Sequence, residues 1–334
     1  MSHQQHVLIV GVGSIGERHL RCFQATGRAR VSFVEINDAL RTTIAQRYDA
    51  RGFADLDSAL AAQVDAAVVA TPANQHVDIA TKLATAGLHV LIEKPLDVRV
   101  DGVKRLAEVA RQRGVLVAVA YVYRCFPALV AMREATLSGR FGRPVELVVV
   151  CGQHFPTYRP AYRDTYYTNR ATGGGAIQDA LTHLLNAGEW LVGPIDRLVA
   201  DAAHRVLADV QVEDTVHLLA RHGEVLGSYS LNQHQGPNEV TLTVVCEHGV
   251  VRWESHLHRW RWVVCPDEPW NDEFHDPLSR DAAFITQANS FLDALGGQAL
   301  PRCSLAEGLQ TLRVNLAALA SVESGSWQIV RGDS

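Results

Sequence analysis

The chain has 334 residues and a net charge of −5, with 47% hydrophobic and 20% charged residues. This length suits two domains that share an interface, and the composition is typical of a soluble globular protein. The acidic balance argues against nucleic acid or an anionic membrane as the main partner.

The cysteines, the N-terminal residues and the apolar runs together predict where the protein resides. The six cysteines form no C-x-x-C pair and no compact disulfide spacing, which predicts a reduced, intracellular chain. Residues 1–6 lead directly into an apolar strand and leave no room for a secretory leader. No apolar run reaches the roughly 18 residues that span a membrane. We therefore expect a cytoplasmic protein with no membrane partner.

The first third of the chain alternates short apolar strands with helices. The strands are continuous apolar runs, as in a parallel sheet that is covered on both faces. Strand–helix–strand repeats with right-handed crossovers predict a doubly wound α/β Rossmann domain over residues 1–122. The expected strands are 7–10, 31–35, 65–70, 89–92 and 115–120, and the expected helices are 15–26, 38–48, 74–86 and 100–113.

After residue 122 the pattern changes. Apolar-rich strands separated by turn residues predict an antiparallel meander between residues 198 and 264, within an α+β domain over 123–334. The C-terminal helices are free to pack back on the first domain. The expected strands are 215–219, 225–231, 240–246, 250–253 and 260–264, and the expected helices are 127–137, 176–191, 281–295 and 305–321.

A G-x-G-x-x-G sequence, Gly11, Gly13 and Gly16, follows the first strand and opens the first helix. In this context the first glycine permits a tight turn and the second lets the backbone approach a pyrophosphate. The third lets the helix pack closely on the sheet, and the helix N-terminus faces the anion. The alternative is a structural turn that binds no ligand.

Glu35 ends the second expected strand, about 20 residues after the glycines. An acidic residue there bonds the ribose hydroxyls and repels a 2′-phosphate, which favours NAD over NADP. Arg41 lies near in sequence and is the residue that would favour NADP. The alternative for Glu35 is a solvated strand end.

Two further segments carry chemistry. Lys94, in Glu93-Lys94-Pro95, follows a buried strand at the ligand-binding edge of the sheet, where an ammonium can stabilise charge developing on a reacting oxygen. Asp179 and His183 follow three glycines and share one helix face, so His183 can act as general acid or base beside Asp179. The alternatives are a surface lysine and an ordinary i, i+4 polar pair.

Other patterns are weaker. His256 and His258 would share one strand face as half of a metal site, but no acidic or cysteine partner is evident, so we expect no metal. Trp260 and Trp262 suggest binding of single-stranded nucleic acid, but the negative net charge argues against it. Their place on a sheet face that contacts another subunit explains them better. Cys125 and Cys151 lack a nucleophile motif and are expected to be buried thiols.

Taken together, these motifs resemble the Gfo/Idh/MocA family, named for glucose–fructose oxidoreductase, inositol dehydrogenase and a rhizopine catabolism protein. The resemblance runs from Val7 to about Val330 and includes the glycine loop, residues 70–76, residues 86–96, residues 121–124 and the Gly-Gly-Gly, Asp179 and His183 run. The E-K-P and D-x-x-x-H elements in this order behind a dinucleotide fold are a specific combination.

The resemblance implies a C-terminal domain with a large open antiparallel sheet and an active site between the domains. It implies assembly into a homodimer or homotetramer through that sheet, and a proline, Pro95, that often has a cis peptide bond. The implied catalytic set is Lys94, Asp179 and His183. The implied cofactor-binding residues are Gly11, Gly13, Ser14, Ile15, Gly16, Glu35, Thr71, Pro72, Asn74, His76, Glu93 and Lys94.

The residues expected to bind substrate include Asp179 and His183 together with four others. Tyr123 and Arg124 match family positions near the cofactor, and Tyr162 and Arg163 lie in an aromatic and basic loop that could stack on a sugar or bond its hydroxyls. Packing of that loop on the sheet is an equal alternative. The chain departs from the family at Asn186, where Asp is frequent, and at Cys125 and Phe126, where an aromatic-polar pair is usual.

The expected function is hydride transfer between NAD and a secondary alcohol or carbonyl of a sugar, polyol or nucleotide sugar. One alternative is a glycosidase or lyase that holds NAD and works by transient oxidation and elimination. The other is a non-catalytic NAD-sensing regulator, which would have no need of Lys94, Asp179 and His183.

Overall fold

The computed structural model describes residues 4–330. Residues 1–3, on which the expected lack of a secretory leader partly depends, lie outside the described residues. The chain forms two compact units. Unit 1 comprises Met1–Cys125 and Ser279–Leu309, and unit 2 comprises Phe126–Leu278 and Gln310–Ser334. The expected boundary at residue 122 lies close to the division after Cys125, and residues 279–309 group with the first unit, which the expectation left open for the C-terminal helices.

Unit 1 contains a six-stranded parallel sheet in the order β3-β2-β1-β4-β5-β6. The order reverses between β1 and β4, and a sheet of this type binds ligands where its strand order reverses. Val7, Leu8 and Ile9 of the central strand are fully buried, which explains its continuous apolar run. The strands are β1 (Gln5–Val10), β2 (Ala29–Val34), β3 (Arg51–Phe53), β4 (Ala66–Val69), β5 (His89–Ile92) and β6 (Val117–Val119).

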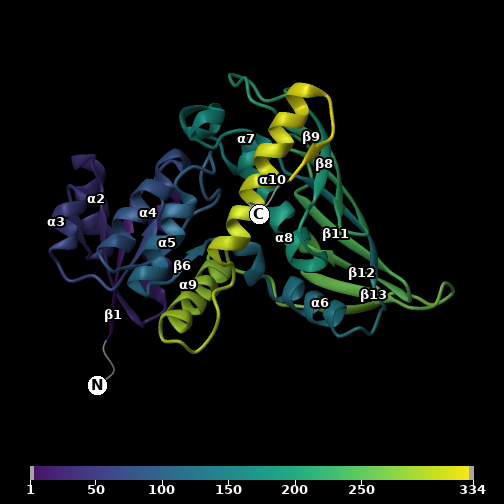
Figure 1. Cartoon of the computed structure of the whole chain (residues 1–334), viewed down its shortest axis with the longest axis horizontal. Helices are drawn as coiled ribbons and strands as arrows, with labels where there is room; N and C mark the ends of the chain where they lie inside the picture. The colour runs from purple at the N-terminus through teal and green to yellow at the C-terminus, as the bar shows by residue number, and fades with distance from the viewer. Residues whose placement is uncertain (1–3, 331–334) are drawn as a thin grey trace. The chain divides into compact units, whose positions relative to one another are not determined.

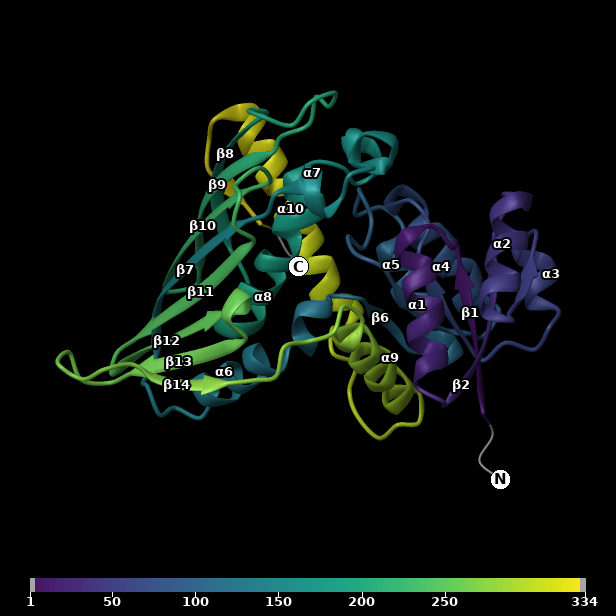
Figure 2. The same ribbon diagram turned by 180° about the vertical axis from the view of Figure 1, so that it is seen from behind.

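Helices cover both faces of this sheet (Figures 1 and 2). Helix α4 packs beside α5, and α1 packs beside α9. Residues 303–308 return to the edge of β6, where Val119 N–H donates to the Cys303 carbonyl at 3.0 Å. The helices are α1 (Ser14–Ala25), α2 (Asp38–Tyr48), α3 (Leu56–Leu60), α4 (His76–Thr85), α5 (Val103–Arg113) and α9 (Ala282–Leu295).

Unit 2 contains a nine-stranded sheet in the order β14-β13-β12-β11-β7-β10-β9-β8-β15, which Figure 2 shows as a fan. The expectation of a wholly antiparallel sheet is wrong at one pair, because β7 runs parallel to β10. Strand β7 inserts between β10 and β11, which run in opposite directions, so it must be parallel to one of them. The strands are β7 (Pro144–Gly152), β8 (Arg197–Ala203), β9 (Thr215–His222), β10 (Val225–Asn232), β11 (Glu239–Cys246), β12 (Gly249–Glu254), β13 (Arg259–Val263), β14 (Asn271–Phe274) and β15 (Gln328–Ile329).

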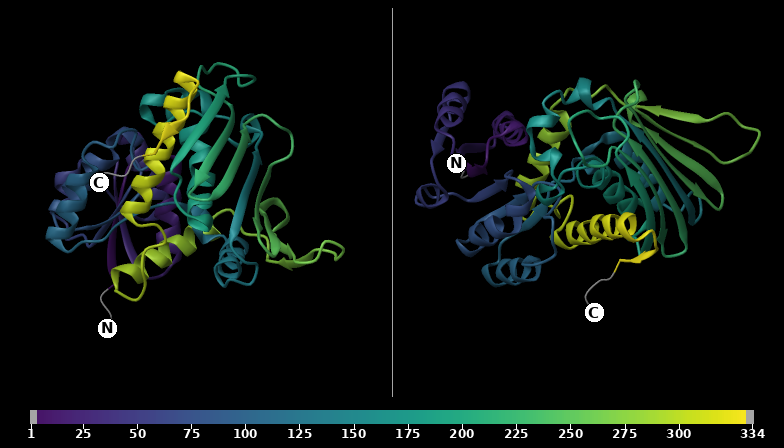
Figure 3. Two further views of the ribbon diagram at one scale, coloured as in Figure 1. Left: turned by 45° about the vertical axis from the view of Figure 1, so that its right-hand side comes forward. Right: turned by 90° about the horizontal axis from the view of Figure 1, so that it is seen from above.

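One face of the unit 2 sheet carries helices and the other does not (Figure 3). Side chains therefore alternate: Leu218 and Tyr229 are buried, whereas Leu219 is 54% exposed and Val150 is 50% exposed. The helices associated with this unit are α6 (Pro127–Leu137), α7 (Phe155–Tyr158), α8 (Thr182–Val192) and α10 (Leu305–Ser324), which begins in unit 1.

Two expectations about local structure need correction or comment. His256 lies in a 3-10 turn, Ser255–Leu257, and His258 has a left-handed backbone with φ of 53°, so they do not share a strand face as the half-site required. Within residues 4–330, no helix combines the length and apolar character needed to cross a bilayer.

Candidate functional site

The glycine loop joins β1 to α1, and its three glycines serve different purposes. Gly11 has φ of +84°, a left-handed conformation that favours glycine. A Cβ on Gly16 would lie 2.9 Å from the Gly11 carbonyl carbon and closer still to its oxygen, so the helix can approach the loop only with glycine there. A Cβ on Gly13 would meet nothing within 4 Å. The fold itself therefore does not require glycine at position 13, and the open space beside it fits an incoming pyrophosphate.

The N-terminus of α1 is suited to an anion. Gly13 is the N-cap residue, and no side chain of the described residues caps the helix there. Gly13 and Ser14 are exposed, and Ile15 is half-buried in the first turn. The first N–H groups of a helix lack intrahelical acceptors and carry the positive end of the helix dipole, so a phosphate would satisfy them.

Glu35 lies directly after β2 and beside the glycine loop. Its carboxylate accepts hydrogen bonds from the Val12 N–H at 3.2 Å and the Asn37 N–H at 2.9 Å. Arg41 donates to the Glu35 backbone carbonyl at 2.8 Å and forms an ion pair with Asp38. The guanidinium is thus already engaged locally, and the acidic group stands nearest the loop.

Thr71 follows β4 across the switch point from the glycines. Its hydroxyl oxygen is buried and has no hydrogen-bond partner among residues 4–330. Its methyl carbon would lie 3.2 Å from a Cβ on Gly11. A buried, unsatisfied hydroxyl is costly and calls for a partner outside the described chain. Pro72 and Asn74 are exposed at the same loop.

The Glu93-Lys94-Pro95 segment follows β5 and has a cis Lys94–Pro95 bond. Lys94 is half-buried, whereas Glu93 is only 4% exposed. The Glu93 carboxylate lies 2.6 Å from His19 Nε2 and accepts the Lys94 N–H at 2.9 Å. Glu93 is therefore buried and holds the backbone of the segment, and its expected contact with the cofactor stays a prediction.

His76 is also a buried support. Its Nδ1 lies 2.9 Å from the Pro95 carbonyl oxygen, and its Nε2 lies 2.8 Å from the Thr71 carbonyl oxygen. Burial lowers the pKa of His76, and the two carbonyls oppose this effect. Because both ring nitrogens face backbone carbonyls, His76 positions the Thr71 and Pro95 loops, and its expected place in the cofactor site stays a prediction.

Tyr123 and Arg124 lie in a 3-10 turn, Val122–Cys125, after β6. Tyr123 is half-buried, but Arg124 is 2% exposed and donates to the Arg302 carbonyl at 2.9 Å. It also pairs with Glu307 at 2.5 Å. Burial raises the pKa of Glu307, but Arg124 and Ser304 outweigh it, so the net pKa is lowered. Arg124 thus makes structural contacts within unit 1, and its expected role in binding substrate stays a prediction.

The three glycines in unit 2 are packed tightly rather than flexible. Gly173 and Gly175 have φ of +94° and +89°. A Cβ on Gly174 would collide with the Tyr167 carbonyl, and a Cβ on Gly175 would collide with the Glu213 carboxylate. Glu213 is buried and accepts the Ile177 N–H at 3.1 Å, which fixes the start of the following helix.

That helix begins as a π-helical segment, Ile177–Leu181, and continues as α8. Asp179 lies in the π segment, and His183 is the second residue of α8, where it is half-buried. Segments of π-helix occur frequently at functional sites. Asp179 is 2% exposed and accepts the Tyr166 hydroxyl at 2.6 Å, with Arg159 Nη1 at 3.9 Å from the same oxygen.

The aromatic loop contributes a different tyrosine from the one expected. Tyr162 is 3% exposed, packs in a cluster with Phe155 and Tyr167, and donates to the Ala208 carbonyl at 3.0 Å. Arg163 donates to the Tyr162 hydroxyl at 3.1 Å. Tyr162 is therefore a core residue, and its expected contact with substrate stays a prediction that this burial does not favour. Tyr166 is the loop tyrosine that contacts Asp179, and residue spacing carried no signal for it.

Asn186, where the family frequently has Asp, is 1% exposed. Its amide donates to the Thr311 hydroxyl at 2.9 Å, so it joins α8 to α10. Position 186 is a structural contact in this chain.

Comparison with known proteins assigns the family. Residues 5–121 match the GFO_IDH_MocA oxidoreductase family with an NAD-binding Rossmann fold, and residues 129–252 match a GFO/IDH/MocA C-terminal domain. The rhizopine catabolism protein MocA of Rhizobium meliloti is 31% identical over 251 residues, which cover 71% of this chain and 74% of that protein. The chain belongs to the Gfo/Idh/MocA family.

Two further comparisons extend over nearly the whole chain. UDP-N-acetylglucosamine 3-dehydrogenase of Acidithiobacillus ferrooxidans is 29% identical over 324 residues, which cover 95% of this chain and 96% of that protein. The WlbA dehydrogenase of Bordetella pertussis, solved with NADH and UDP-GlcNAcA, is similar with a TM-score of 0.83 and 26% identity. The match covers 99% of this chain and 100% of that chain. The sequence prediction of the family and of an NAD-binding fold is confirmed.

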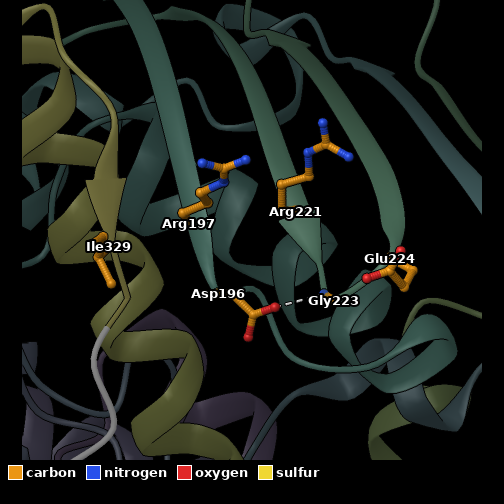
Figure 4. Close-up of a pocket in the computed structure, with 6 residues that line it drawn as sticks. All are labelled: Asp196, Arg197, Arg221, Gly223, Glu224 and Ile329. Carbon is orange, nitrogen blue, oxygen red and sulfur yellow. Dashed lines mark hydrogen bonds between the residues drawn. The ribbon is translucent and has the colours of Figure 1, made fainter.

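In this Gfo/Idh/MocA chain a surface hollow of about 420 Å³ lies at the β8–β9–β15 edge of unit 2 (Figure 4). Neither Asp179 nor His183 lines it, so it is separate from the expected catalytic residues. The Asp196 carboxylate accepts the Gly223 N–H there at 2.7 Å. The lining residues are Asp196, Arg197, Arg221, Gly223, Glu224 and Ile329.

The cysteines are unpaired in the family member described here. Cys125 and Cys151 are buried, as expected, and burial raises their pKa values to about 11 and about 12. Cys265 is the exposed thiol of the six. Among residues 4–330, no three His, Cys, Asp or Glu side chains are grouped so as to hold a metal ion.

Proposed function

We propose that this protein is an NAD-dependent oxidoreductase that acts on a secondary alcohol or carbonyl of a sugar, polyol or nucleotide sugar. The observation that carries the proposal is the open side of Gly13 at an uncapped helix N-terminus, with Glu35 beside the same loop. These groups fit a pyrophosphate and a ribose diol. The orphan Thr71 hydroxyl at the same switch point supports this assignment.

The proposed cofactor-binding residues separate into those that contact NAD and those that support the contact. Contacts come from the glycine loop, including Ser14 and Ile15, from Glu35, and from the loop with Thr71, Pro72 and Asn74. Carboxylate oxygens on Glu35 accept from ribose hydroxyls and repel a 2′-phosphate, so NAD is preferred over NADP. When bound, NAD supplies the nicotinamide carbon that accepts or returns a hydride.

The proposed catalytic residues are Lys94, Asp179 and His183, acting on one substrate molecule. His183 takes the hydroxyl proton during oxidation and returns it during reduction, since an imidazole titrates near neutral pH. The Lys94 ammonium stabilises negative charge on the reacting oxygen. Asp179 orients the substrate or His183, and Tyr166 fixes the Asp179 carboxylate through its 2.6 Å hydrogen bond.

The proposed substrate class rests on the relatives and on the donors around Asp179. Tyr166 and Arg159 are both partly exposed next to this carboxylate, an arrangement suited to hydroxyl groups or to the acidic groups of a sugar derivative. Tyr123 of unit 1 is a further candidate contact. UDP-N-acetylglucosamine 3-dehydrogenase is one of the relatives that match nearly the whole chain, so nucleotide sugars belong in the first assay.

The test is a panel of myo-inositol, free hexoses, sugar acids and UDP-N-acetylglucosamine with NAD, followed by NADH absorbance. With an active substrate, Lys94→Ala and His183→Ala should each lower kcat by about 10²- to 10⁴-fold, the range of general acid–base and electrostatic contributions. The exposed Lys104→Ala and His248→Ala variants are matched controls and should keep wild-type rates.

The outcomes discriminate among the candidate functions. Near-normal rates in both catalytic variants would refute the mechanism. Product formation without NADH accumulation would instead indicate transient oxidation with elimination. NAD binding without turnover on any compound, unaffected by either variant, would indicate a sensor.

We also propose that the protein is a cytoplasmic homodimer or homotetramer assembled through the helix-free face of the unit 2 sheet. Support comes from three apolar side chains on neighbouring strands of that face, Val150, Leu219 and Leu226, each about half exposed. Light scattering of Leu219→Glu and Val150→Glu should show dissociation to monomers. A wild-type protein that is already monomeric would refute this assembly, and cell fractionation tests the location.

A further inference from the structure

A buried hydrogen bond between His19 and Glu93 connects the phosphate-binding helix to the Lys94 segment. His19 lies on α1, six residues after the N-cap Gly13, and its Nε2 is 2.6 Å from Glu93 Oε1. The two side chains are 1% and 6% exposed. The second oxygen of Glu93 accepts the backbone N–H of Lys94 at 2.9 Å. One carboxylate thus joins residues that are far apart in the sequence but adjacent at the ligand-binding edge.

Helix α1 is also held from its far side. The His19 ring meets the Phe284 ring edge-on, with centroids 5.7 Å apart, and Arg21 pairs bidentately with Asp281 at the start of α9. The pKa of Asp281 is lowered, chiefly by the hydrogen bond from Arg21. These contacts fix α1 laterally against α9.

The Lys94 segment is supported on its other side as well. His76 lies against the Pro95 carbonyl at 2.9 Å, and the Asp97 carboxylate accepts the Val98 N–H at 2.7 Å. The backbone that carries Lys94 is therefore fixed by three buried side chains. Only the one from Glu93 leads to the phosphate-binding helix.

We infer that His19 and Glu93 are positioning residues that couple dinucleotide binding at α1 to the placement of the Lys94 ammonium. This rests on the proposed role of Lys94 in the reaction. Folding alone does not require this contact, because replacing both partners of a buried hydrogen bond by apolar groups of the same shape can be nearly neutral. A short, charge-assisted hydrogen bond in a dry site instead fixes geometry, and a misplacement of about 1 Å at a reacting group can lower a rate by about 10²-fold.

Two substitutions of His19 separate the hydrogen bond from the loss of the ring. Glutamine places its amide nitrogen about where Nε2 lies, so His19→Gln can keep a donor to Glu93. Asparagine is shorter and places its amide near Nδ1, so His19→Asn loses that donor. Both remove the aromatic contact with Phe284. We expect His19→Gln to behave like the wild type and His19→Asn not to.

The first measurement needs only NAD. In the wild type and in His19→Gln, addition of NAD should slow amide hydrogen exchange of Lys94, whereas in His19→Asn exchange should be at least about 10-fold faster and insensitive to NAD. Equal protection in all three proteins would refute the coupling. If His19→Asn does not fold, Glu93→Gln replaces it in the same comparison, because its uncharged amide weakens the same bond.

The second measurement is a double-mutant cycle on kcat with a substrate found in the panel. His19→Asn should lower kcat by about 10- to 100-fold in the wild type but have no further effect in a Lys94→Ala background, because it acts through Lys94. Additive losses would show a merely structural role and refute the inference. A Lys94→Ala variant with normal kcat would refute the proposed function instead, while the exchange experiment would still test the coupling.

Discussion

Glycines 13 and 16 stand three residues apart in one loop, and the structure predicts opposite consequences for replacing them with alanine. At Gly13 the backbone has φ of −61°, which any residue adopts, and a Cβ meets no atom within 4 Å. At Gly16 a Cβ collides with the backbone of Gly11. Gly13→Ala should therefore damage NAD binding with little effect on folding, and Gly16→Ala should damage folding itself.

The magnitudes follow from these contacts. Overpacking of this kind costs about 1–3 kcal/mol, and the upper end applies to Gly16 because the opposing atoms are backbone and cannot rotate away. A loss of about 3 kcal/mol should lower Tm by roughly 6–12 °C in a unit of this size. Gly13→Ala alters only an N-cap, which costs at most about 1 kcal/mol. Its methyl group would displace a charge-assisted phosphate contact of about 1.5–3 kcal/mol, or roughly 10- to 100-fold in Kd.

The assay is a thermal melt without ligand combined with an NADH fluorescence titration. Gly102, at the N-cap of α5, offers a positive-φ comparison outside the loop, so Gly102→Ala should lower Tm and leave the NADH Kd unchanged. The reasoning would be refuted by a Gly13→Ala protein that binds NADH as tightly as the wild type. It would equally be refuted by a Gly16→Ala protein with an unchanged Tm.

Three more predictions concern individual side chains. Glu35→Ala should weaken NAD binding by about 10-fold in calorimetry and leave NADP binding unchanged or improved. The substitution removes the acceptor for the ribose hydroxyls and, with it, the charge that repels a 2′-phosphate. Equal wild-type affinities for NAD and NADP would contradict this. Tyr166→Phe should lower kcat/KM by about 10-fold with little change in Tm, because the donor to Asp179 is lost, and an unchanged kcat/KM would remove Tyr166 from the site. Iodoacetamide at pH 8 should label the exposed Cys265 but not Cys151. Burial raises the pKa of Cys151 to about 12, so its reactive thiolate is scarce at pH 8. Labelling of Cys151 before unfolding would show that it is not buried.

The parts of the site that were predictable are those built from contiguous residues. A strand, three glycines at fixed spacing and a helix define the phosphate loop locally, and Glu35 follows at the end of the next strand. The roles of Glu93 and His76 were not predictable, because the same motif is compatible with a side chain above or below its backbone. Only the contacts with His19 and with the Thr71 and Pro95 carbonyls decide it.

Unit 2 shows the same limit. A helix over residues 176–191 was expected from periodicity, but its π-helical start was not, because the backbone there is held by Glu213 from a distant part of the chain. Tyr162 and Tyr166 are equivalent by composition and spacing. One packs into an aromatic cluster and the other reaches Asp179, a difference that arises from the turns between them.

The amino-acid sequence by itself determined most of the strand–helix alternation of the first unit, the phosphate loop and the family, since each is encoded by residues close together along the chain. Strands β3, β7, β8, β14 and β15 were not anticipated from the sequence. Tertiary structure alone decided that β7 pairs in parallel with β10 and that residues 279–309 return to unit 1. It also decided that the Arg124 guanidinium forms an ion pair with Glu307. These outcomes depend on the packing of side chains from segments that are far apart in the sequence. Such packing does not change the hydrophobic periodicity of either segment, so the periodicity cannot predict it.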